Sequence, residues 1–172
     1  MQELIAKIEQ WAHDRNIIKG SKPIDQAMKL FSEFGELADN VGKGCDCRDD
    51  IGDVFVVLTI MSAQYGQNIY DLINEDSQEW MYSYPLKDAV VELGFELYLT
   101  SSNVEQGGCI SSAVGLLNEI CLYLNYTLEE CVQIAYNDIK DRKGIMNNGV
   151  FIKESDPAYK DVVASIESNY TP

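Results

Sequence analysis

The most constraining feature of the sequence is the run from Ile51 to Gly66, which reads IGDVFVVLTIMSAQYG. Its apolar side chains fall on most sides of an α-helix rather than along one stripe. Such a helix is buried away from water only when neighbouring elements pack around it on several sides. Glycine at position 66 is a typical helix end. The run therefore predicts a bundle of helices built around a central helix at 51–65.

Amphipathic segments elsewhere in the chain can surround this central helix. Between residues 2 and 15, apolar side chains recur at helical spacing and form one stripe. Pro23 marks the start of a second helix, and glycines at 42 and 44 mark its end. We expect helices near 2–15, 23–41, 51–65, 68–80, 85–101, 111–124 and 127–142, a break at Gly107-Gly108, a capping box at Thr127 and Glu130, a turn at Asn147-Asn148-Gly149 and a short helix near 161–168.

These elements predict an all-α fold, a helical bundle of about six or seven helices. The length suits a single domain over residues 1–172, with 143–172 as a C-terminal extension. Sliding the chain by 59 to 60 residues places 32–40 over 92–100 and 51–72 over 110–131 with matching apolar positions. Duplication of a helical hairpin explains this echo, and so does a shared amphipathic pattern. Both interpretations stay open.

Charge limits the partners of this chain. It has 13 Lys and Arg against 28 Asp and Glu, for a net charge of −15. A surplus of this size repels nucleic acid and anionic membranes from the general surface and leaves room for cations. The longest nearly apolar stretch, Val54 to Ala63, is too short to cross a bilayer, and the first residues lack the zones of a signal peptide. We expect a cytoplasmic protein without nucleic-acid or membrane partners.

Four acidic residues have the spacing of a metal site. Glu33 and Glu36 lie one turn apart on the second expected helix, and Asp50 and Asp53 repeat this spacing at the start of the third. An antiparallel pair of helices would bring the two pairs face to face. Carboxylate oxygens suit Mg²⁺, with Mn²⁺ as an alternative ion. Because Asp53 lies among apolar residues, its carboxylate needs a cation or a hydrogen-bond partner.

Other interpretations of the same acids stay open. They can be solvated side chains on a non-catalytic acidic helical interaction module, or part of an acidic surface that mimics nucleic acid. Mimics spread charge over a face, whereas these acids are clustered. Ferritin-like di-iron sites need Glu-x-x-His twice, and this chain has one His, outside the acidic region. Oxygen-bound Mg²⁺ is therefore the favoured metal.

The acidic motifs resemble those of a known family. EFGE at 33–36 and DIGD at 50–53 are similar to the paired E-x-x-E and E/D-x-x-D motifs of the MazG-like all-α nucleoside triphosphate pyrophosphohydrolases, relatives of the dimeric dUTPases. The similarity extends from WAHDRNIIKG at 11–20 to YNDIKDRKGIMNNGVFIKE at 136–154, most of the chain. Asp50 departs from the pattern, because the family usually has Glu there. The shorter side chain changes the reach of this ligand and keeps its charge.

The resemblance implies a hydrolase of nucleotide metabolism that depends on Mg²⁺. It cleaves a nucleoside triphosphate or its deoxy form between the α and β phosphates, giving a nucleoside monophosphate and pyrophosphate. Glu33, Glu36, Asp50 and Asp53 would then bind the metal, and Glu33 or Glu36 would orient the attacking water.

Residues for substrate binding are expected near the end of the last long helix. Lys140, Arg142 and Lys143 form a basic cluster that suits either phosphate or a helix C-terminus, and the resemblance favours phosphate. It also places Asn137 near the nucleoside. Because the helix at 51–65 is apolar on most sides, and because relatives assemble, we expect a homodimer or a higher homo-oligomer.

Overall fold

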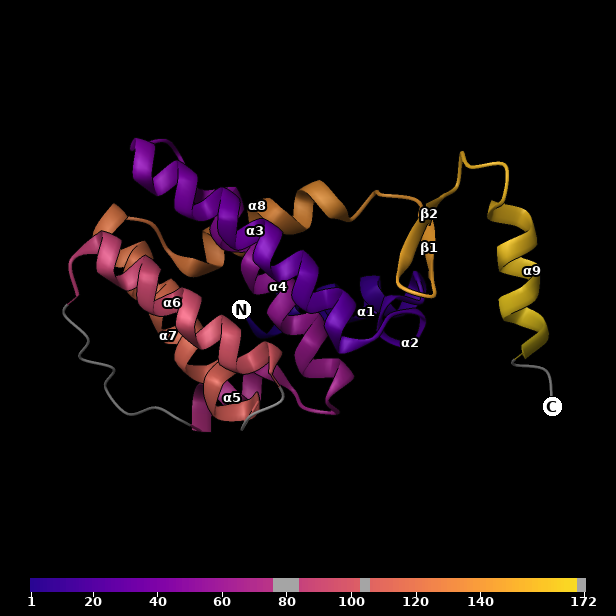
Figure 1. Ribbon diagram of the computed structural model, residues 1–172, viewed down its shortest axis with the longest axis horizontal. Helices are drawn as coiled ribbons and strands as arrows, with labels where there is room; N and C mark the ends of the chain where they lie inside the picture. Colours follow the sequence, from indigo (N-terminus) through magenta and orange to yellow (C-terminus); the bar gives the residue numbers. More distant parts are fainter. Residues whose placement is uncertain (76–83, 103–105, 170–172) are drawn as a thin grey trace.

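The structure is a computed structural model that describes residues 1–75, 84–102 and 106–169. It is a bundle of α-helices with one two-stranded sheet at its edge (Figure 1). The helices are α1 (Gln2–Asp14), α2 (Ile17–Gly20), α3 (Pro23–Lys43), α4 (Arg48–Gln64), α5 (Ile69–Glu75), α6 (Leu86–Ser101), α7 (Gln106–Leu124), α8 (Leu128–Ile139) and α9 (Tyr159–Asn169), and the strands are β1 (Gly144–Asn147) and β2 (Val150–Lys153). The predicted all-α class is confirmed.

The core of the bundle lies around α4. This helix packs against α1, α3, α7 and α8, and from Ile51 to Ser62 each residue except Asp53 is buried. A methyl group added at Gly52 would lie 2.2 Å from the carbonyl oxygen of Cys131, so the absence of a side chain lets α8 approach α4 closely. The chain's own helices therefore cover the apolar circumference of α4. A second copy is not needed to cover the apolar residues of α4. A homodimer would have to form through a different surface.

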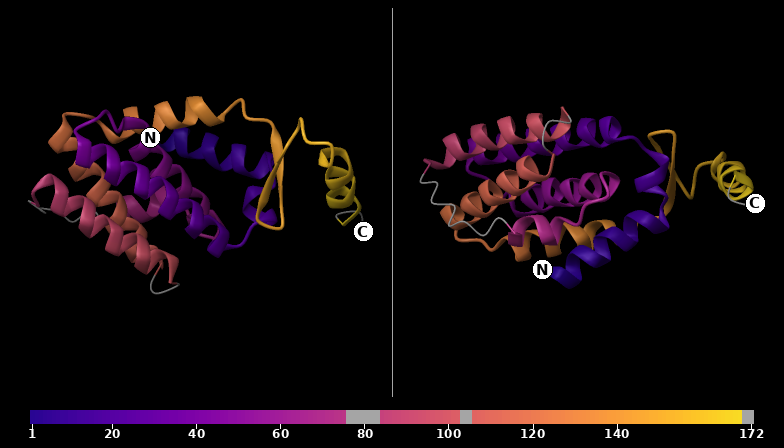
Figure 2. Two further views of the ribbon diagram at one scale, coloured as in Figure 1. Left: turned by 45° about the horizontal axis from the view of Figure 1, so that its top comes forward. Right: turned by 90° about the horizontal axis from the view of Figure 1, so that it is seen from below.

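Two helical hairpins make up most of the bundle. The helices α3 and α4 pack together, as do α6 and α7, and α3 packs beside α6 (Figure 2). These two hairpins lie at the offset of the internal echo in the sequence. A duplicated hairpin is consistent with this arrangement.

Most helix ends lie where the local sequence signals place them. Pro23 is the first residue of α3, and Gly44 ends this helix with a φ of 70°. The hydroxyl of Thr127 accepts a hydrogen bond of 3.2 Å from the backbone N–H of Glu130 at the start of α8. The expected break at Gly107-Gly108 is wrong, because α7 begins at Gln106 and runs through both glycines. Part of the expected helix at 68–80 lies outside the described residues.

The β-hairpin and the short helix α2 were not predicted from the sequence. The expected turn is confirmed at Asn148-Gly149, where φ values of 50° and 79° suit a two-residue hairpin turn. The hairpin docks on the segment before α3. The backbone N–H groups of Met146 and Gly149 each donate a 2.8 Å hydrogen bond to this segment, to the carbonyl oxygens of Arg15 and Gly20. Residues 144–153 thus belong to the body of the fold.

Beyond the hairpin, α9 stands apart from the helical bundle (Figures 1 and 2). Among the described elements, α9 packs mainly against β1. The helix overlaps the short helix expected near 161–168. In the part of the chain that the structure describes, no helix is both long and apolar enough to cross a membrane.

Candidate functional site

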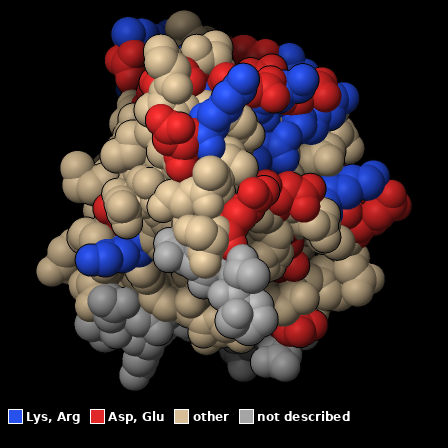
Figure 3. Space-filling view, turned by 90° about the vertical axis from the view of Figure 1, so that its right-hand side faces the viewer, with Lys and Arg blue, Asp and Glu red and all other residues tan. Residues whose placement is uncertain are grey.

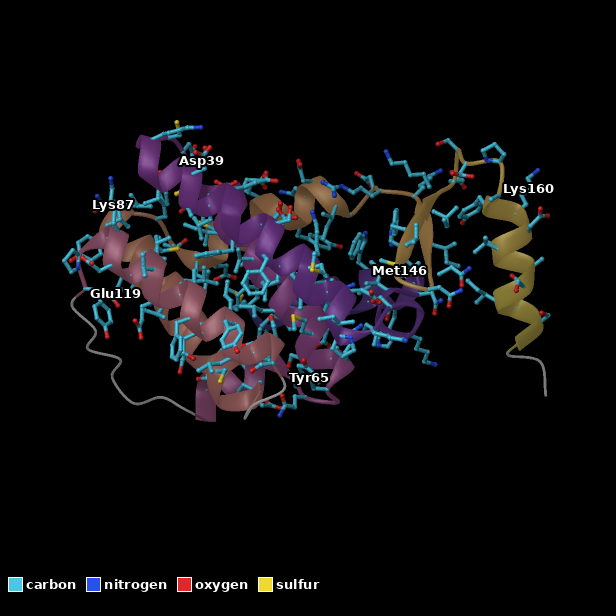
Figure 4. All side chains as sticks on the ribbon, viewed as in Figure 1. Asp39, Tyr65, Lys87, Glu119, Met146 and Lys160 are labelled. Atoms are coloured by element: carbon cyan, nitrogen blue, oxygen red, sulfur yellow. The ribbon has the colours of Figure 1, made fainter. Side chains whose placement is uncertain are left out.

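A pocket of about 330 Å³ opens between α3, α4, the end of α8 and the hairpin. Its polar side consists of Asp25, Gln26, Lys29, Glu33, Asp53 and Arg142. Its apolar wall includes Trp11, Ile17, Val56, Val57, Ile60 and Phe151. Met146 also lines the pocket, from the place where the hairpin meets the helices (Figure 4). On the face nearest the hairpin and α9, acidic and basic side chains gather side by side (Figure 3). One cavity therefore offers an apolar wall and a charged rim.

Glu33 and Asp53 bring two predicted carboxylates to this pocket from neighbouring helices. Glu33 is 4% exposed, and its carboxylate is ion-paired with Lys29, one turn earlier on α3. Asp53 is half-buried on α4. Burial, together with the negative charges of Glu33 and Asp49, raises the pKa of Asp53 to about 7. The carboxyl of Asp53 therefore lies where a negative charge is costly without a nearby cation.

Asp50 lies close to the same group of acids but has its own partner. Its carboxylate accepts a hydrogen bond of 2.7 Å from the side-chain amide of Asn40. Burial raises the pKa of Asp50, the hydrogen bond lowers it, and the charge of Glu33 raises it. Asp49, which was not predicted as a site residue, also has a raised pKa because of burial and the charge of Asp138. Negative charge is thus concentrated at the start of α4.

The side-chain positions do not by themselves form a metal-binding cluster. Within the described ranges, no three His, Cys, Asp or Glu side chains are placed to hold one ion. Lys29 occupies the carboxylate of Glu33, and Asn40 occupies that of Asp50. Glu36 is exposed and is not among the residues that line the pocket. Binding of a cation by the four predicted acids would therefore require these side chains to rearrange.

The predicted substrate residues separate into one that faces the pocket and three that do not line it. Arg142 lines the pocket. Lys140 and Asn137 are exposed, and the ammonium of Lys140 donates a hydrogen bond of 3.2 Å to the side-chain carbonyl of Asn137. Lys143 is exposed and forms a 3.6 Å ion pair with Glu154. The basic cluster therefore presents one side chain to the cavity.

Arg15 holds the end of α8 in place and was missed in the sequence. Its guanidinium donates hydrogen bonds to the backbone carbonyls of Arg142, at 2.6 Å, and Lys140, at 3.0 Å. The same guanidinium lies 5.0 Å from the centre of the Trp11 ring. Trp11 lies on α1, and Arg15 directly follows this helix, four residues after Trp11. This spacing is the sequence signal that could have identified the two residues.

Trp11 has a buried indole N–H that finds no hydrogen-bond partner among the described residues. An unpaired buried donor costs free energy, and this one belongs to a residue that lines the pocket. A ligand with an acceptor atom could pair with it. Lys29 also lines the pocket without having been predicted as a site residue, and its spacing of four residues from Glu33 was the signal in the sequence.

Replacing Lys29 by Met should destabilise the metal-free protein by about 1–3 kcal/mol, because the buried carboxylate of Glu33 would lose its charged partner. Mg²⁺ should then recover more stability in the variant than in the parent, since the competing ammonium is gone. Urea titrations with EDTA or Mg²⁺ measure both effects. Lys7→Met is the matched control, because Lys7 forms a similar pair with the exposed Glu3. Equal stability of Lys29→Met and Lys7→Met would contradict this prediction.

Comparisons with known proteins leave the function open. No family model matches the chain. It is similar to an uncharacterized 18.2 kDa protein from the rep-hol intergenic region of Haemophilus phage HP1 (strain HP1c1), with 48% identity over 66 residues. The match covers 37% of this chain and 40% of the phage protein. No solved structure matches at a significant level.

Proposed function

We propose that this protein is a metal-dependent nucleotide pyrophosphohydrolase that cleaves nucleoside triphosphates, or their deoxy forms, between the α and β phosphates. The supporting observation is that Glu33, Asp53 and Arg142 border one cavity that also has an apolar wall. Nucleotides need this combination, because the triphosphate is anionic and the base is flat and largely apolar on its faces. The resemblance of the two acidic motifs to the MazG-like family supports the same reaction.

The acids in and near the pocket are oxygen donors that suit the proposed metal chemistry once their side chains rearrange. Glu33, Asp50 and Asp53 would hold Mg²⁺ or Mn²⁺, with Glu36 as a fourth carboxylate, since all are oxygen donors. The raised pKa of Asp53, about 7, supports this proposal, because a bound cation would stabilise its negative charge. The bound ion would neutralise phosphate charge and activate the attacking water. Glu33 is the better placed of the two glutamates to orient this water, because it lines the pocket.

Arg142 and the apolar wall would contact different parts of the substrate. The guanidinium of Arg142 would contact the triphosphate, where its planar fork can bind two oxygens. The rings of Trp11 and Phe151 lie on the apolar wall, where a nucleobase can pack. Asn137, Lys140 and Lys143 do not line the pocket. We propose that they act on the substrate indirectly or contact the part of it that extends out of the pocket. A pocket of about 330 Å³ is large enough for a small organic ligand.

Release of pyrophosphate from a panel of nucleoside and deoxynucleoside triphosphates tests this proposal. With Mg²⁺ we expect pyrophosphate and the monophosphate as products from at least one member, and no turnover in EDTA. Release of inorganic phosphate alone would point to another cleavage. No turnover with Mg²⁺ or Mn²⁺, together with no Mg²⁺ binding by calorimetry, would favour the non-catalytic acidic interaction module.

We also propose a cytoplasmic homodimer. Nucleoside triphosphates are cytoplasmic metabolites, so the proposed activity places the enzyme in that compartment. The homodimer would form through a surface other than that of α4, because α4 is buried within the chain.

A further inference from the structure

The outward face of α3 is apolar or small along its whole length. Ile24, Met28 and Phe31 lie on this face and are between 40% and 71% exposed. The exposed Gly35 and Gly42 and the half-buried Ala38 continue the same line at steps of three and four residues. The line carries no charge, in a chain of which 24% of the residues are charged.

The neighbouring helix α6 continues this surface. Val91, Phe95 and Tyr98 are each more than half exposed at the same helical spacing. The two helices lie side by side (Figures 1 and 2), and the ring of Phe34 on α3 packs where Gly94 of α6 has no side chain. The α3/α6 patch consists of Ile24, Met28, Phe31, Val91, Phe95 and Tyr98.

The size of the α3/α6 patch suits a protein interface. Its six large side chains expose on the order of 700 Å², whereas a standard interface buries about 800 Å² on each partner. Contiguous apolar patches of this size on a monomer mark interaction sites. A protein with a net charge of −15 repels its own copies over most of its surface, so an uncharged face is where two copies can approach.

Two glycines on α3 have open space around them. A methyl group added at Gly35 or Gly42 would meet no other atom of the described residues within 4 Å. Glycine inside a helix is less favourable than alanine, because it loses more backbone freedom on folding. Close approach of another helix gives these positions a reason to lack side chains, as it does for Gly52 beneath α8.

We propose that the α3/α6 patch is the interface of a homodimer in which α3 lies antiparallel to α3 of a second copy. The six positions along α3 have the same spacing in either direction, with large residues in one half and small residues in the other. Ile24 then faces Gly42 of the partner subunit, Met28 faces Ala38 of the partner subunit, and Phe31 faces Gly35 of the partner subunit. A two-fold axis repeats each contact reciprocally.

A second copy of the chain fits this face better than an unrelated protein, because the large residues in one half of α3 match the small residues in the other half. Each half of α3 presents the shape that the other half needs, so the surface is complementary to itself. The same two-fold axis brings the exposed residues of α6 in the two copies to one side of the α3 pair. The inference does not depend on hydrolysis of nucleotides, since it uses no residue of the pocket.

Sedimentation equilibrium at micromolar concentration tests the interface with two charge variants. Met28→Glu should shift the mass from dimer to monomer and weaken self-association at least 100-fold, because it places a carboxylate opposite an apolar partner. Leu122→Glu is the matched control, since Leu122 is 68% exposed on α7 outside the patch, and it should stay dimeric. Circular dichroism checks that both variants fold. The measurement needs no nucleotide, so its result is independent of the proposed activity.

Gly35→Gln provides a second variant that does not threaten folding. It improves helix propensity in open space, so the fold should be retained or strengthened while the dimer dissociates. A monomeric parent protein at tens of micromolar would overturn the proposal. A dimer that survives both Met28→Glu and Gly35→Gln would overturn it as well, because the interface would then lie elsewhere.

Discussion

Asp53→Asn should lower turnover of nucleoside triphosphates by on the order of 10²–10³-fold or more, while the protein remains folded. The amide keeps the shape of the side chain and removes the charge that would hold the cation. Of Asp49, Asp50 and Asp53 at the start of α4, Asp53 has the pKa that is raised furthest, chiefly by burial, so its negative charge depends most on a cation. Affinity for Mg²⁺ should fall together with turnover, and calorimetry with Mg²⁺ measures that part separately.

The same variant should change how stability depends on pH in the metal-free protein. Unfolding returns the pKa of Asp53 from about 7 to about 3.8, so the folded state holds an extra proton between these values. Stability from this group therefore falls as pH rises from about 4 to 7. Asp53→Asn removes the ionising group. In EDTA, the parent should lose more stability than the variant between pH 5 and pH 8.

Asp88→Asn is the matched control for both measurements. Asp88 is exposed on α6 and does not line the pocket. It should leave turnover, Mg²⁺ affinity and the pH profile of stability close to those of the parent. Full turnover in the Asp53 variant would show that the carboxylates at the start of α4 are not part of the chemistry, and the proposed function would then lose its main support.

Helical periodicity explains why the bundle could be predicted. The buried run at 51–65 and the amphipathic stripes around it are long, so their period distinguishes them clearly from strands. The hairpin at 144–153 is too short to show a period of its own, and the hydrogen bonds that dock it go to Arg15 and Gly20, which are distant in sequence. The break at Gly107-Gly108 failed because the packing of α7 outweighs the low helix propensity of glycine.

The site could be predicted only in part, because spacing gives the face of a helix and not the partner of each side chain. Glu33 and Asp53, which the sequence places on two neighbouring helices, both line the pocket. The spacing of four residues marks Lys29 as a neighbour of Glu33 on α3, but spacing could not show that Asn40 pairs with Asp50. It also could not show that Glu36 faces solvent. The apolar wall joins α1, α4 and the hairpin, and no local pattern links these segments.

Arg142→Ala should lower kcat/KM by about 10²–10³-fold, mainly by removing stabilisation of charge on the triphosphate. Arg142 lines the pocket, and its positive charge lowers the pKa of Asp53, so its guanidinium acts at the acidic side of the cavity. Lys140→Ala should change kcat/KM only by a few-fold, because Lys140 does not line the pocket and pairs with Asn137. Steady-state kinetics with the preferred nucleotide measures both.

Arg142→Lys separates charge from geometry at this position. It keeps the positive charge and loses the planar fork that binds two phosphate oxygens, so its activity should lie between the parent and Arg142→Ala. Affinity of the free protein for Mg²⁺ should stay within a few-fold of the parent in all three variants, because none removes a carboxylate. The basic residues would then act on the triphosphate, and the acidic residues would act on the cation. A larger loss for Lys140→Ala than for Arg142→Ala would place the triphosphate outside the cavity, along the exposed face of α8.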